Sequence, residues 1–243
     1  MNYSIPAPIY RRRFLIFDVE TTGLLPKKVK NVPPPTIDQY PYIIQLSFAI
    51  YDIYDRRIIR SYDSYIKLPK TVEISEFVTN LTGITNEICE TQGRNIIRVL
   101  KHFYAAYREC EGLVAHNMDF DEKMILVEIE RNHEEIMKRA PYCLTMFNPI
   151  HEKVNNIERY CTMRRGTALC NIDLKQLESI QDTDDTKIKR PKMKKFPKLA
   201  ELFKTLFENE TLPANLHNSM IDVLVCLKCY LKMRHNIDDK LIL

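Results

Sequence analysis

The amino-acid sequence predicts an α/β fold in which helices flank a central mixed sheet of five strands. The first observation is a pair of β-branched and aromatic segments, residues 43–53 and 56–67, separated by Tyr54 and Asp55. Two such segments joined by a short polar link indicate an antiparallel hairpin. The second observation is that helical patterns alternate with short apolar segments after this hairpin, which is typical of a sheet with crossover helices.

Each expected element has its own signal in the sequence. The expected strands are short apolar or β-branched segments, and they span residues 14–20, 43–53, 56–67, 112–116 and 160–163. The expected helices space their apolar residues by three or four, and they span residues 75–81, 95–110, 119–140, 199–207 and 219–233. In helix 119–140, the residues expected to face the core are Phe120, Met124, Val127 and Met137.

Length and composition predict one domain. The chain has 243 residues, of which 45% are hydrophobic, and this is enough for one substantial core. We expect a single domain over residues 1–243 with its core at about 13–233, and with loops 25–41 and 181–198 as insertions. The basic run 187–198 is either a solvated loop or a nucleic-acid contact. The net charge of +4 permits an anionic partner without requiring one.

The cysteines and the lack of long apolar runs predict an intracellular protein in a reducing compartment, the cytoplasm or the nucleus. Seven cysteines are irregularly spaced, and the first residues lack the apolar region of a secretory signal. No apolar run reaches the roughly 18–20 residues that span a bilayer, so we expect neither secretion nor a membrane partner. Cys226 and Cys229 are expected to be buried helical thiols, because structural zinc needs four ligands and no suitable second pair follows.

Two acids, Asp18 and Glu20, stand at the end of the first expected strand. Side chains alternate along a strand, so these two would project on the same face, about 6.6 Å apart. Two carboxylates on a buried strand repel each other and lose hydration unless a cation such as Mg²⁺ or Mn²⁺ lies between them. Alternatively, the strand ends at Phe17, Asp18 caps the next element and Glu20 is solvated. This stretch alone leaves both interpretations open.

Three further residues precede or begin helices. Asp121 follows the strand 112–116 at a helix start, where acids are ordinary because they suit the positive helix end. Ser219 to Asp222 fits a capping box, which is a structural explanation for Asp222. His217 lies five residues before Asp222, about 140° of helical rotation away, so we expect it on the preceding loop and able to fold back beside the acid. An exposed loop histidine is the alternative.

Taken together, these motifs resemble the DEDDh branch of the DnaQ-like 3′→5′ exonuclease superfamily, which has a ribonuclease-H-like fold. The resemblance covers nearly the whole chain, and its strongest part is the combination of HNxxFD and HxxxxD at the right spacing. The motifs that carry it are Asp18-Val-Glu20, Thr21-Thr-Gly-Leu24, Leu81-Thr-Gly-Ile-Thr85, His116-Asn-x-x-Phe-Asp121, Tyr160-Cys-Thr-Met163, Pro197-Lys-Leu-Ala-Glu-Leu-Phe203 and His217-x4-Asp222.

The resemblance implies a role for each acid. Asp18 would bridge two divalent cations, Mg²⁺ or Mn²⁺, with Glu20 and Asp222 completing the tighter site and Asp121 acting on the second cation. His217 would be the general base, since an unperturbed imidazole titrates at about 6.5. The implied reaction is two-metal-ion hydrolysis of the terminal phosphodiester, which releases nucleoside 5′-monophosphates.

The resemblance also implies a nucleotide-binding set. Thr22 and Leu24 would hold the terminal nucleotide through main-chain contact and base packing, and Asn117 and Phe120 would line the same pocket. Core packing remains the alternative for Leu24 and Phe120. His116 would order its turn rather than take part in the chemistry.

The implied partner is the 3′ end of a nucleic acid, with DNA favoured over RNA and single-stranded or frayed ends favoured over paired ones. The alternatives are an exoribonuclease with the same chemistry and an inactive exonuclease-like module that binds nucleic acid or a protein. A polymerase or repair partner stays unspecified. The chain departs from the family pattern at Gln45, where many relatives carry a glutamate, and in the long loop 25–41, which could shape the substrate channel or the choice of partner.

Overall fold

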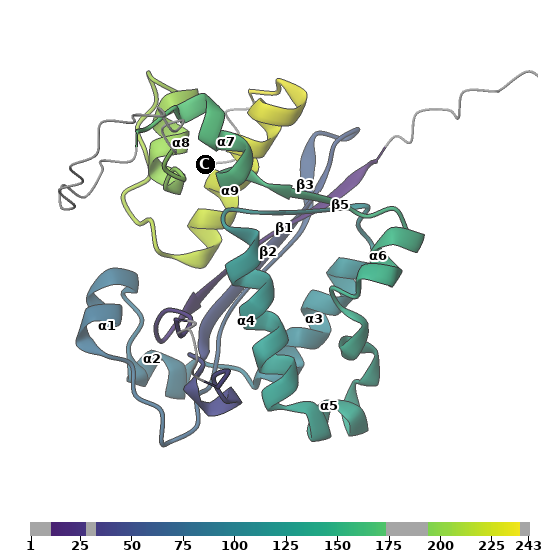
Figure 1. Cartoon of the computed structure of the whole chain (residues 1–243), viewed down its shortest axis with the longest axis vertical. Helices are drawn as coiled ribbons and strands as arrows, with labels where there is room; N and C mark the ends of the chain where they lie inside the picture. The colour runs from purple at the N-terminus through teal and green to yellow at the C-terminus, as the bar shows by residue number, and fades with distance from the viewer. Residues whose placement is uncertain (1–10, 28–32, 174–193, 239–243) are drawn as a thin grey trace, which may run out of the picture.

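The computed structural model describes residues 11–27, 33–173 and 194–238. Its five strands form one mixed sheet, as predicted (Figure 1). The order of the strands in the sheet is β3-β2-β1-β4-β5. The central strand β1 pairs antiparallel with β2 and parallel with β4, and β4 pairs parallel with β5. The strands are β1 (Arg13–Thr21), β2 (Ile43–Asp52), β3 (Arg57–Tyr65), β4 (Gly112–Ala115) and β5 (Glu158–Cys161).

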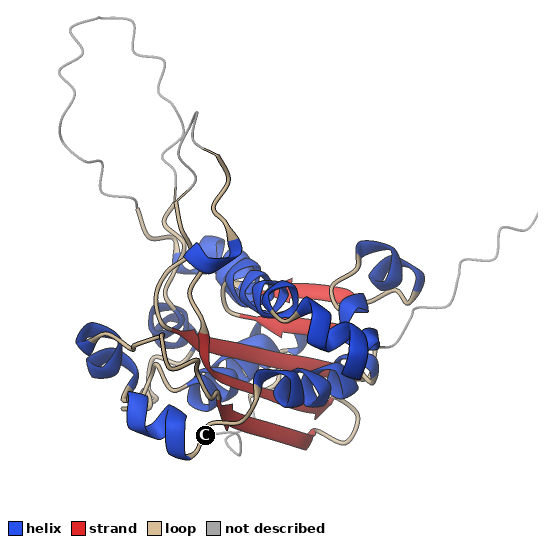
Figure 2. Cartoon of the chain, turned by 90° about the horizontal axis from the view of Figure 1, so that it is seen from below, coloured by secondary structure: helices blue, strands red, loops and turns tan. Residues whose placement is uncertain are grey.

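Helices cover both faces of this sheet (Figure 2). They are α1 (Glu76–Thr82), α2 (Asn86–Thr91), α3 (Ile96–Arg108), α4 (Met118–Arg131), α5 (His133–Arg139), α6 (Pro149–Val154), α7 (Thr162–Cys170), α8 (Leu199–Leu206) and α9 (Ser219–His235). Two short 3-10 helices, η1 (Ile37–Gln39) and η2 (Pro141–Thr145), complete the described elements. No helix within the described ranges is long and apolar enough to cross a membrane.

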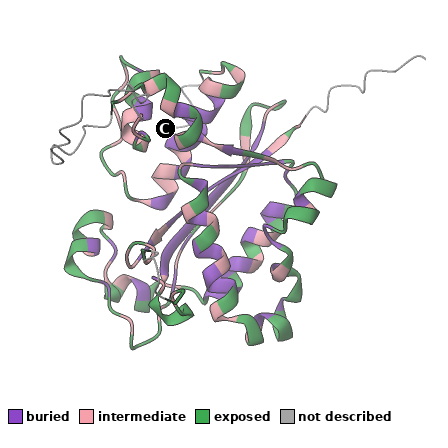
Figure 3. Cartoon of the chain, in the orientation of Figure 1, coloured by how far each residue is buried: buried purple, intermediate pink, exposed green. Residues whose placement is uncertain are grey.

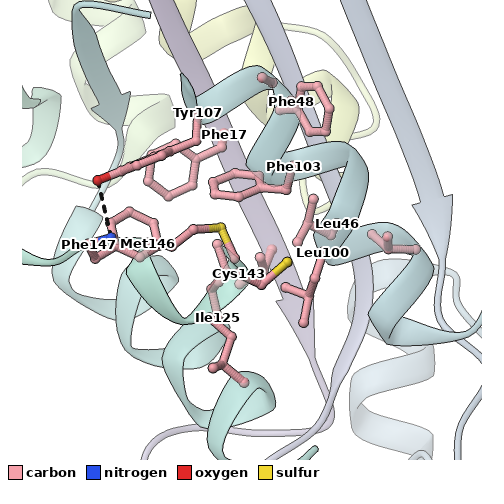
Figure 4. Close-up of a cluster of buried hydrophobic side chains, with 14 of the residues drawn as sticks. Phe17, Leu46, Phe48, Leu100, Phe103, Tyr107, Ile125, Cys143, Met146 and Phe147 are labelled. Atoms are coloured by element: carbon pink, nitrogen blue, oxygen red, sulfur yellow. Dashed lines mark hydrogen bonds between the residues drawn. The ribbon is translucent and has the colours of Figure 1, made fainter. Parts of the chain in front are cut away.

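The core has two layers because β1 buries apolar side chains on both of its faces. On one face, Phe17 packs edge-on against Phe103 of α3, with ring centroids 5.3 Å apart (Figure 4). On the other face, Phe14 packs against Tyr230 of α9, with ring centroids 5.2 Å apart. The interior strands are therefore buried while the outer helix faces are exposed (Figure 3). This arrangement fixes β1 as the rigid base for the two acids near its end.

The expected helix 119–140 is wrong in one respect, because it is two helices. Asn132 ends α4 and begins α5, and its side-chain amide donates to the carbonyl of Glu128 at 2.8 Å. The change of direction at Asn132 alters which later residues face inward, so Met137 is 51% exposed rather than buried. Ile136 is buried in its place.

Other boundaries differ more modestly from the expectation. The last strand ends at Cys161 and α7 begins at Thr162, whereas the sequence predicted a strand to residue 163. The short helices α2, α6 and α7 had not been expected. All seven cysteines are free, Cys226 and Cys229 are buried in α9, and among the described residues neither belongs to a group of three metal-ligating side chains.

Candidate active site

Strand β1 continues past both of its acids. It runs to Thr21, so the alternative in which the strand ends at Phe17 is wrong. Asp18 and Glu20 are each half-buried. The Oδ2 atom of Asp18 is buried and has no hydrogen-bond partner in the described part of the chain. A buried carboxylate oxygen without a donor is costly, and it marks a position that a cation would satisfy.

Asp121 reaches the same region from the start of α4. The chain leaves β4 and turns at Asn117, whose φ of 71° is unusual for a residue other than glycine. Asp121 is 2% exposed, and its Oδ1 accepts a hydrogen bond from the Val19 amide at 3.1 Å. Its Oδ2 is buried without a partner among the residues described, as in Asp18. By contrast, Asp119 of the same helix turn is exposed and forms an ion pair with Arg164.

The start of α9 brings the last acid and the histidine to β1. The capping-box explanation for Ser219 and Asp222 is wrong, because Asn218 is the N-cap and its side chain accepts from Met220 and Ile221. Asp222 instead accepts the His217 amide at 3.1 Å. His217 lies on the preceding loop with a φ of 72°, folded back toward the acid as predicted.

The four acids and His217 therefore converge. Ligand atoms of Glu20, His217 and Asp222 all lie within 4.8 Å of one another, an arrangement that could hold a metal ion. Asp18 lies close enough to Asp222, Glu20 and Asp121 for its charge to act on each of them. Strand β1, helix α4, the loop before α9 and α9 itself each supply part of this group.

Burial and mutual repulsion disfavour the ionised form of the acids. Burial, followed by the charges of neighbouring acids, raises the pKa of Asp18 and of Asp121 well above the ordinary range. The same two causes raise the pKa of Glu20 to about 9, and burial raises that of Asp222 to about 6. A divalent cation would reverse this tendency, because opposite charge favours the carboxylate form. The oxygen donors, their burial and their unpaired atoms fit Mg²⁺ or Mn²⁺.

The residues expected to bind the nucleotide differ in their contacts and in their exposure to solvent. The pairing register shifts between Glu20 and Thr21, a bulge that bends the strand end. The Thr22 amide donates to the Tyr42 carbonyl at 2.9 Å and its Oγ1 accepts the Tyr42 amide at 3.0 Å, so the amide of Thr22 is already occupied. Leu24 is 87% exposed, which excludes core packing. Phe120 is half-buried and packs on the edge of the core.

Two polar residues support the cluster through contacts that the sequence did not predict: Gln45 was given no role, and Ser219 was expected only as part of a capping box. Gln45 is fully buried, and its Oε1 accepts the Ser219 amide at 3.2 Å while its Nε2 donates to Asp63 at 2.9 Å. The Ser219 hydroxyl donates to the Asp18 carbonyl at 2.7 Å. These bonds attach the start of α9 to β1 and β2. The available signal was a glutamine inside an otherwise apolar strand.

His116 connects the turn before α4 to two distant segments. Its Nε2 lies 3.1 Å from the Pro197 carbonyl, which can only accept, and its Nδ1 lies 2.9 Å from the Thr162 hydroxyl. Burial lowers the pKa of His116 to about 4, so the ring is neutral at ordinary pH. These contacts agree with a role in ordering the turn.

A family model described as Exonuclease matches residues 15–230. The chain belongs to the exonuclease family. Its resemblance to the DEDDh, DnaQ-like branch is confirmed, and so are its ribonuclease-H-like fold and its assignment as a nuclease. The DEDDh exonucleases use divalent metal ions.

Curated relatives of this exonuclease are much longer proteins. The PolC-type DNA polymerase III of Thermotoga petrophila is 32% identical over 130 residues, which cover 54% of this chain and 8% of the polymerase. The 3′-5′ exonuclease DinG of Bacillus subtilis is 28% identical over 127 residues, which cover 50% of this chain and 11% of DinG. The chain thus spans about a tenth of the length of these relatives.

Solved structures of exonuclease I share the fold of this exonuclease. One of them matches with a TM-score of 0.59 at 16% identity and covers 93% of this chain and 42% of its own. Escherichia coli exonuclease I in complex with a dT13 oligonucleotide matches with a TM-score of 0.56, also at 16% identity, over 93% of this chain and 42% of its own.

Proposed function

We propose that this exonuclease removes nucleoside 5′-monophosphates one at a time from unpaired 3′ ends of DNA, using two divalent cations. The observation that carries the proposal is the convergence of Asp18, Glu20, Asp121 and Asp222, with buried carboxylate oxygens that lack a partner in the described residues. Such a group destabilises the fold unless it binds cations. When bound, the cations supply positive charge that balances the acids and the charge developing on the phosphate.

The chain's own residues perform three tasks in this proposal. Asp18, Glu20, Asp121 and Asp222 orient the cations, and the rigid ends of β1, α4 and α9 fix their geometry. Thr22, Leu24, Asn117 and Phe120 hold the terminal nucleotide. Leu24 supports its part of this assignment because an exposed apolar side chain beside a buried acid cluster is available to a base.

His217 is proposed as the general base. It takes a proton from the water whose oxygen forms the new bond to the terminal phosphorus, while the bond to the 3′ oxygen of the preceding nucleotide breaks. That oxygen leaves and takes up a proton. Burial lowers the pKa of His217, with a further effect from the charge of Lys198, and a lower pKa keeps the imidazole neutral and able to accept a proton.

The position of His217 among possible ligands also allows a second role, direct metal binding. Replacement by glutamine separates the two roles. A general base predicts a fall in kcat of about a hundredfold or more with unchanged Mn²⁺ affinity measured by calorimetry. A ligand predicts weaker Mn²⁺ binding.

The decisive experiment is digestion of 3′-labelled single-stranded DNA, frayed duplex DNA and RNA, with Mg²⁺, with Mn²⁺ and with a chelator. We expect labelled mononucleotide from DNA only with metal. Faster release from RNA would favour the exoribonuclease alternative, and no release with any substrate would favour an inactive binding module. One relative is a DNA polymerase, but this does not assign a polymerase partner to this chain. Affinity purification would test whether the chain binds a polymerase or a repair protein.

A further inference from the structure

The loop insertion forms a pocket against helix α4, the helix that also carries Asp121. A cavity of about 900 Å³ lies between helix α4 and the described parts of the loop, residues 25–27 and 33–40. This volume lies in the ~300–1,000 Å³ range of small-molecule and cofactor pockets. The residues whose chemistry matters here are Leu25, the proline run 33–35, Tyr40, Asp119 and Lys123.

The pocket borders the residues proposed to hold the terminal nucleotide. Leu25 directly follows Leu24, and Asp119 directly precedes Phe120. One helical residue turns by about 100°, so the pocket-lining Asp119 and Lys123 lie on a face of α4 next to that of Phe120 and away from Asp121. The pocket is therefore adjacent to the nucleotide position but distinct from the acid cluster.

The lining suits a nucleobase and its phosphate. The prolines, Leu25 and the Tyr40 ring offer apolar and aromatic surface, and the Nζ atom of Lys123 lies 5.0 Å from the centre of that ring. The ammonium of Lys123 is exposed and available to an anion. The carboxylate of Asp119, the acid in the lining, forms an ion pair with Arg164, which offsets its repulsion of phosphate. Single-stranded nucleic acids bind through this combination of aromatic surface and cations.

A buried ion pair on α4 holds this wall of the pocket in place. The guanidinium of Arg131 donates to the carbonyls of Tyr40 and Pro41 at 3.0 and 3.1 Å, and its carbon lies 3.7 Å from the centre of the Tyr42 ring. Glu128 forms an ion pair with Arg131 and accepts the Ile43 amide at 3.2 Å. The segment that carries Tyr40 is therefore fixed to the same helix that forms the opposite wall.

We propose that this pocket binds a second nucleotide of the substrate, with its base against Tyr40 and the proline run and its phosphate at Lys123. The inference rests on the proposed nuclease function and extends its substrate site beyond the terminal nucleotide. The second nucleotide belongs either to the degraded strand or to the unpaired end of a complementary strand, and both offer the same base and phosphate.

The test compares two variants, Tyr40→Ala and Lys123→Gln, on substrates of increasing length. The substrates are the p-nitrophenyl ester of thymidine 5′-monophosphate, single strands of two to twelve nucleotides, and a frayed duplex. We expect KM to rise about tenfold for strands of two or more nucleotides and less than twofold for the ester. Lys123→Gln should also reduce the slope of log affinity against log salt by about one. A loss seen only with the frayed duplex assigns the nucleotide to the complementary strand.

Two matched variants serve as controls. Tyr54→Ala removes a tyrosine of the β2–β3 turn that is 59% exposed. Like Tyr40, this tyrosine has a cationic side chain over its ring, that of Arg12. Lys138→Gln removes an exposed lysine on α5. Both should keep the wild-type KM with every substrate.

Three results would overturn the proposal. The first is a wild-type KM in both pocket variants, as expected if the proline-rich wall contacts a protein instead. The second is an equal loss on the ester and the longer strands, which would mean that Tyr40 affects only the site of the terminal nucleotide. If the wild type hydrolyses nothing, the nuclease function fails, but fluorescence anisotropy with labelled single strands still tests the pocket. The third result is then that both pocket variants bind these strands as tightly as the wild type.

Discussion

Helix α4 buries two acids about two turns apart, and they differ in what surrounds them. Asp121 and Glu128 are each 2% exposed. Glu128 accepts hydrogen bonds from the Ile43 amide and the Asn132 side chain and forms an ion pair with Arg131. Asp121 accepts one backbone hydrogen bond and keeps a buried oxygen without a partner among the described residues. The two acids are therefore equally buried, and Asp121 differs from Glu128 by its buried oxygen without a partner among the described residues.

The largest expected effect is a loss of nuclease activity when Asp18 or Asp121 is replaced. Asp18→Asn or Asp121→Asn should lower kcat by at least about a thousandfold, because each removes a proposed cation ligand. The free energy of unfolding of the metal-free protein should stay equal or rise, because a buried charge without a partner is removed. Nuclease assays and urea denaturation measure the two quantities. Either variant with full activity would refute its assignment as a metal ligand.

Glu128→Gln should reduce stability while most of the nuclease activity is kept. Breaking the buried pair leaves Arg131 without its carboxylate partner, so the free energy of unfolding should fall by about 3 kcal/mol. The kcat of the folded protein should fall less than tenfold, because Glu128 is not among the proposed metal ligands. Arg139→Gln is the control, since its ion pair with Glu135 is exposed and should contribute little. A thousandfold loss of kcat in Glu128→Gln would contradict the assignment of Glu128 as a structural acid and Asp121 as a catalytic one.

The pH dependence of stability should report the raised pKa of Glu20 in the acid cluster. The folded protein keeps Glu20 protonated up to its pKa of about 9, whereas the unfolded chain releases that proton above about pH 4.3. The folded state then binds more protons, so the free energy of unfolding of the metal-free protein should fall as pH rises from about 5 to about 9. Thermal denaturation at several pH values measures this slope.

Two further measurements identify the groups responsible for that slope. Adding Mg²⁺ at pH 8 should restore stability through binding to the folded state. Glu20→Gln should flatten the slope. A profile that is identical in Glu20→Gln and the wild type would show that Glu20 does not carry this effect.

The smallest expected effect concerns the neighbouring acid at the start of α4. Asp119→Asn should change kcat less than twofold and the free energy of unfolding by less than about 0.5 kcal/mol, because its ion pair with Arg164 is exposed. Parallel assays of Asp119→Asn and Asp121→Asn would therefore compare an acid outside the proposed metal site with one inside it, at the same helix turn. A loss in Asp119→Asn comparable to that in Asp121→Asn would contradict this reading of the site.

Much of the fold was predictable because its signals are local. The strands of the hairpin are dense in β-branched and aromatic residues, and helix α3 shows a regular apolar face. The helices α2 and α6 were missed because six residues are too few for an amphipathic pattern to repeat. The break at Asn132 was also hidden, because apolar spacing continues through it while the backbone changes direction.

The candidate site was predictable as a set of residues but not as a network. Spacing and resemblance identified the acids and His217 before any geometry was known. The bonds that support the site and the neighbouring pocket join residues far apart in the chain: Gln45 to Ser219 at the site, and Arg131 to the carbonyl of Tyr40 at the pocket. Sequence patterns report neighbours along one element, so contacts of this kind become visible only in three dimensions.

The bond from Ser219 to the carbonyl of Asp18 joins residues that are 201 positions apart in the chain. Asp222 and His217 are consequently among the last parts of the site to leave a ribosome. A nascent chain that has already produced Asp18, Glu20 and Asp121 still lacks the fourth acid and the proposed base until α9 is made and docks on β1. The proposed catalytic site would therefore be incomplete in any fragment of the chain that ends before α9.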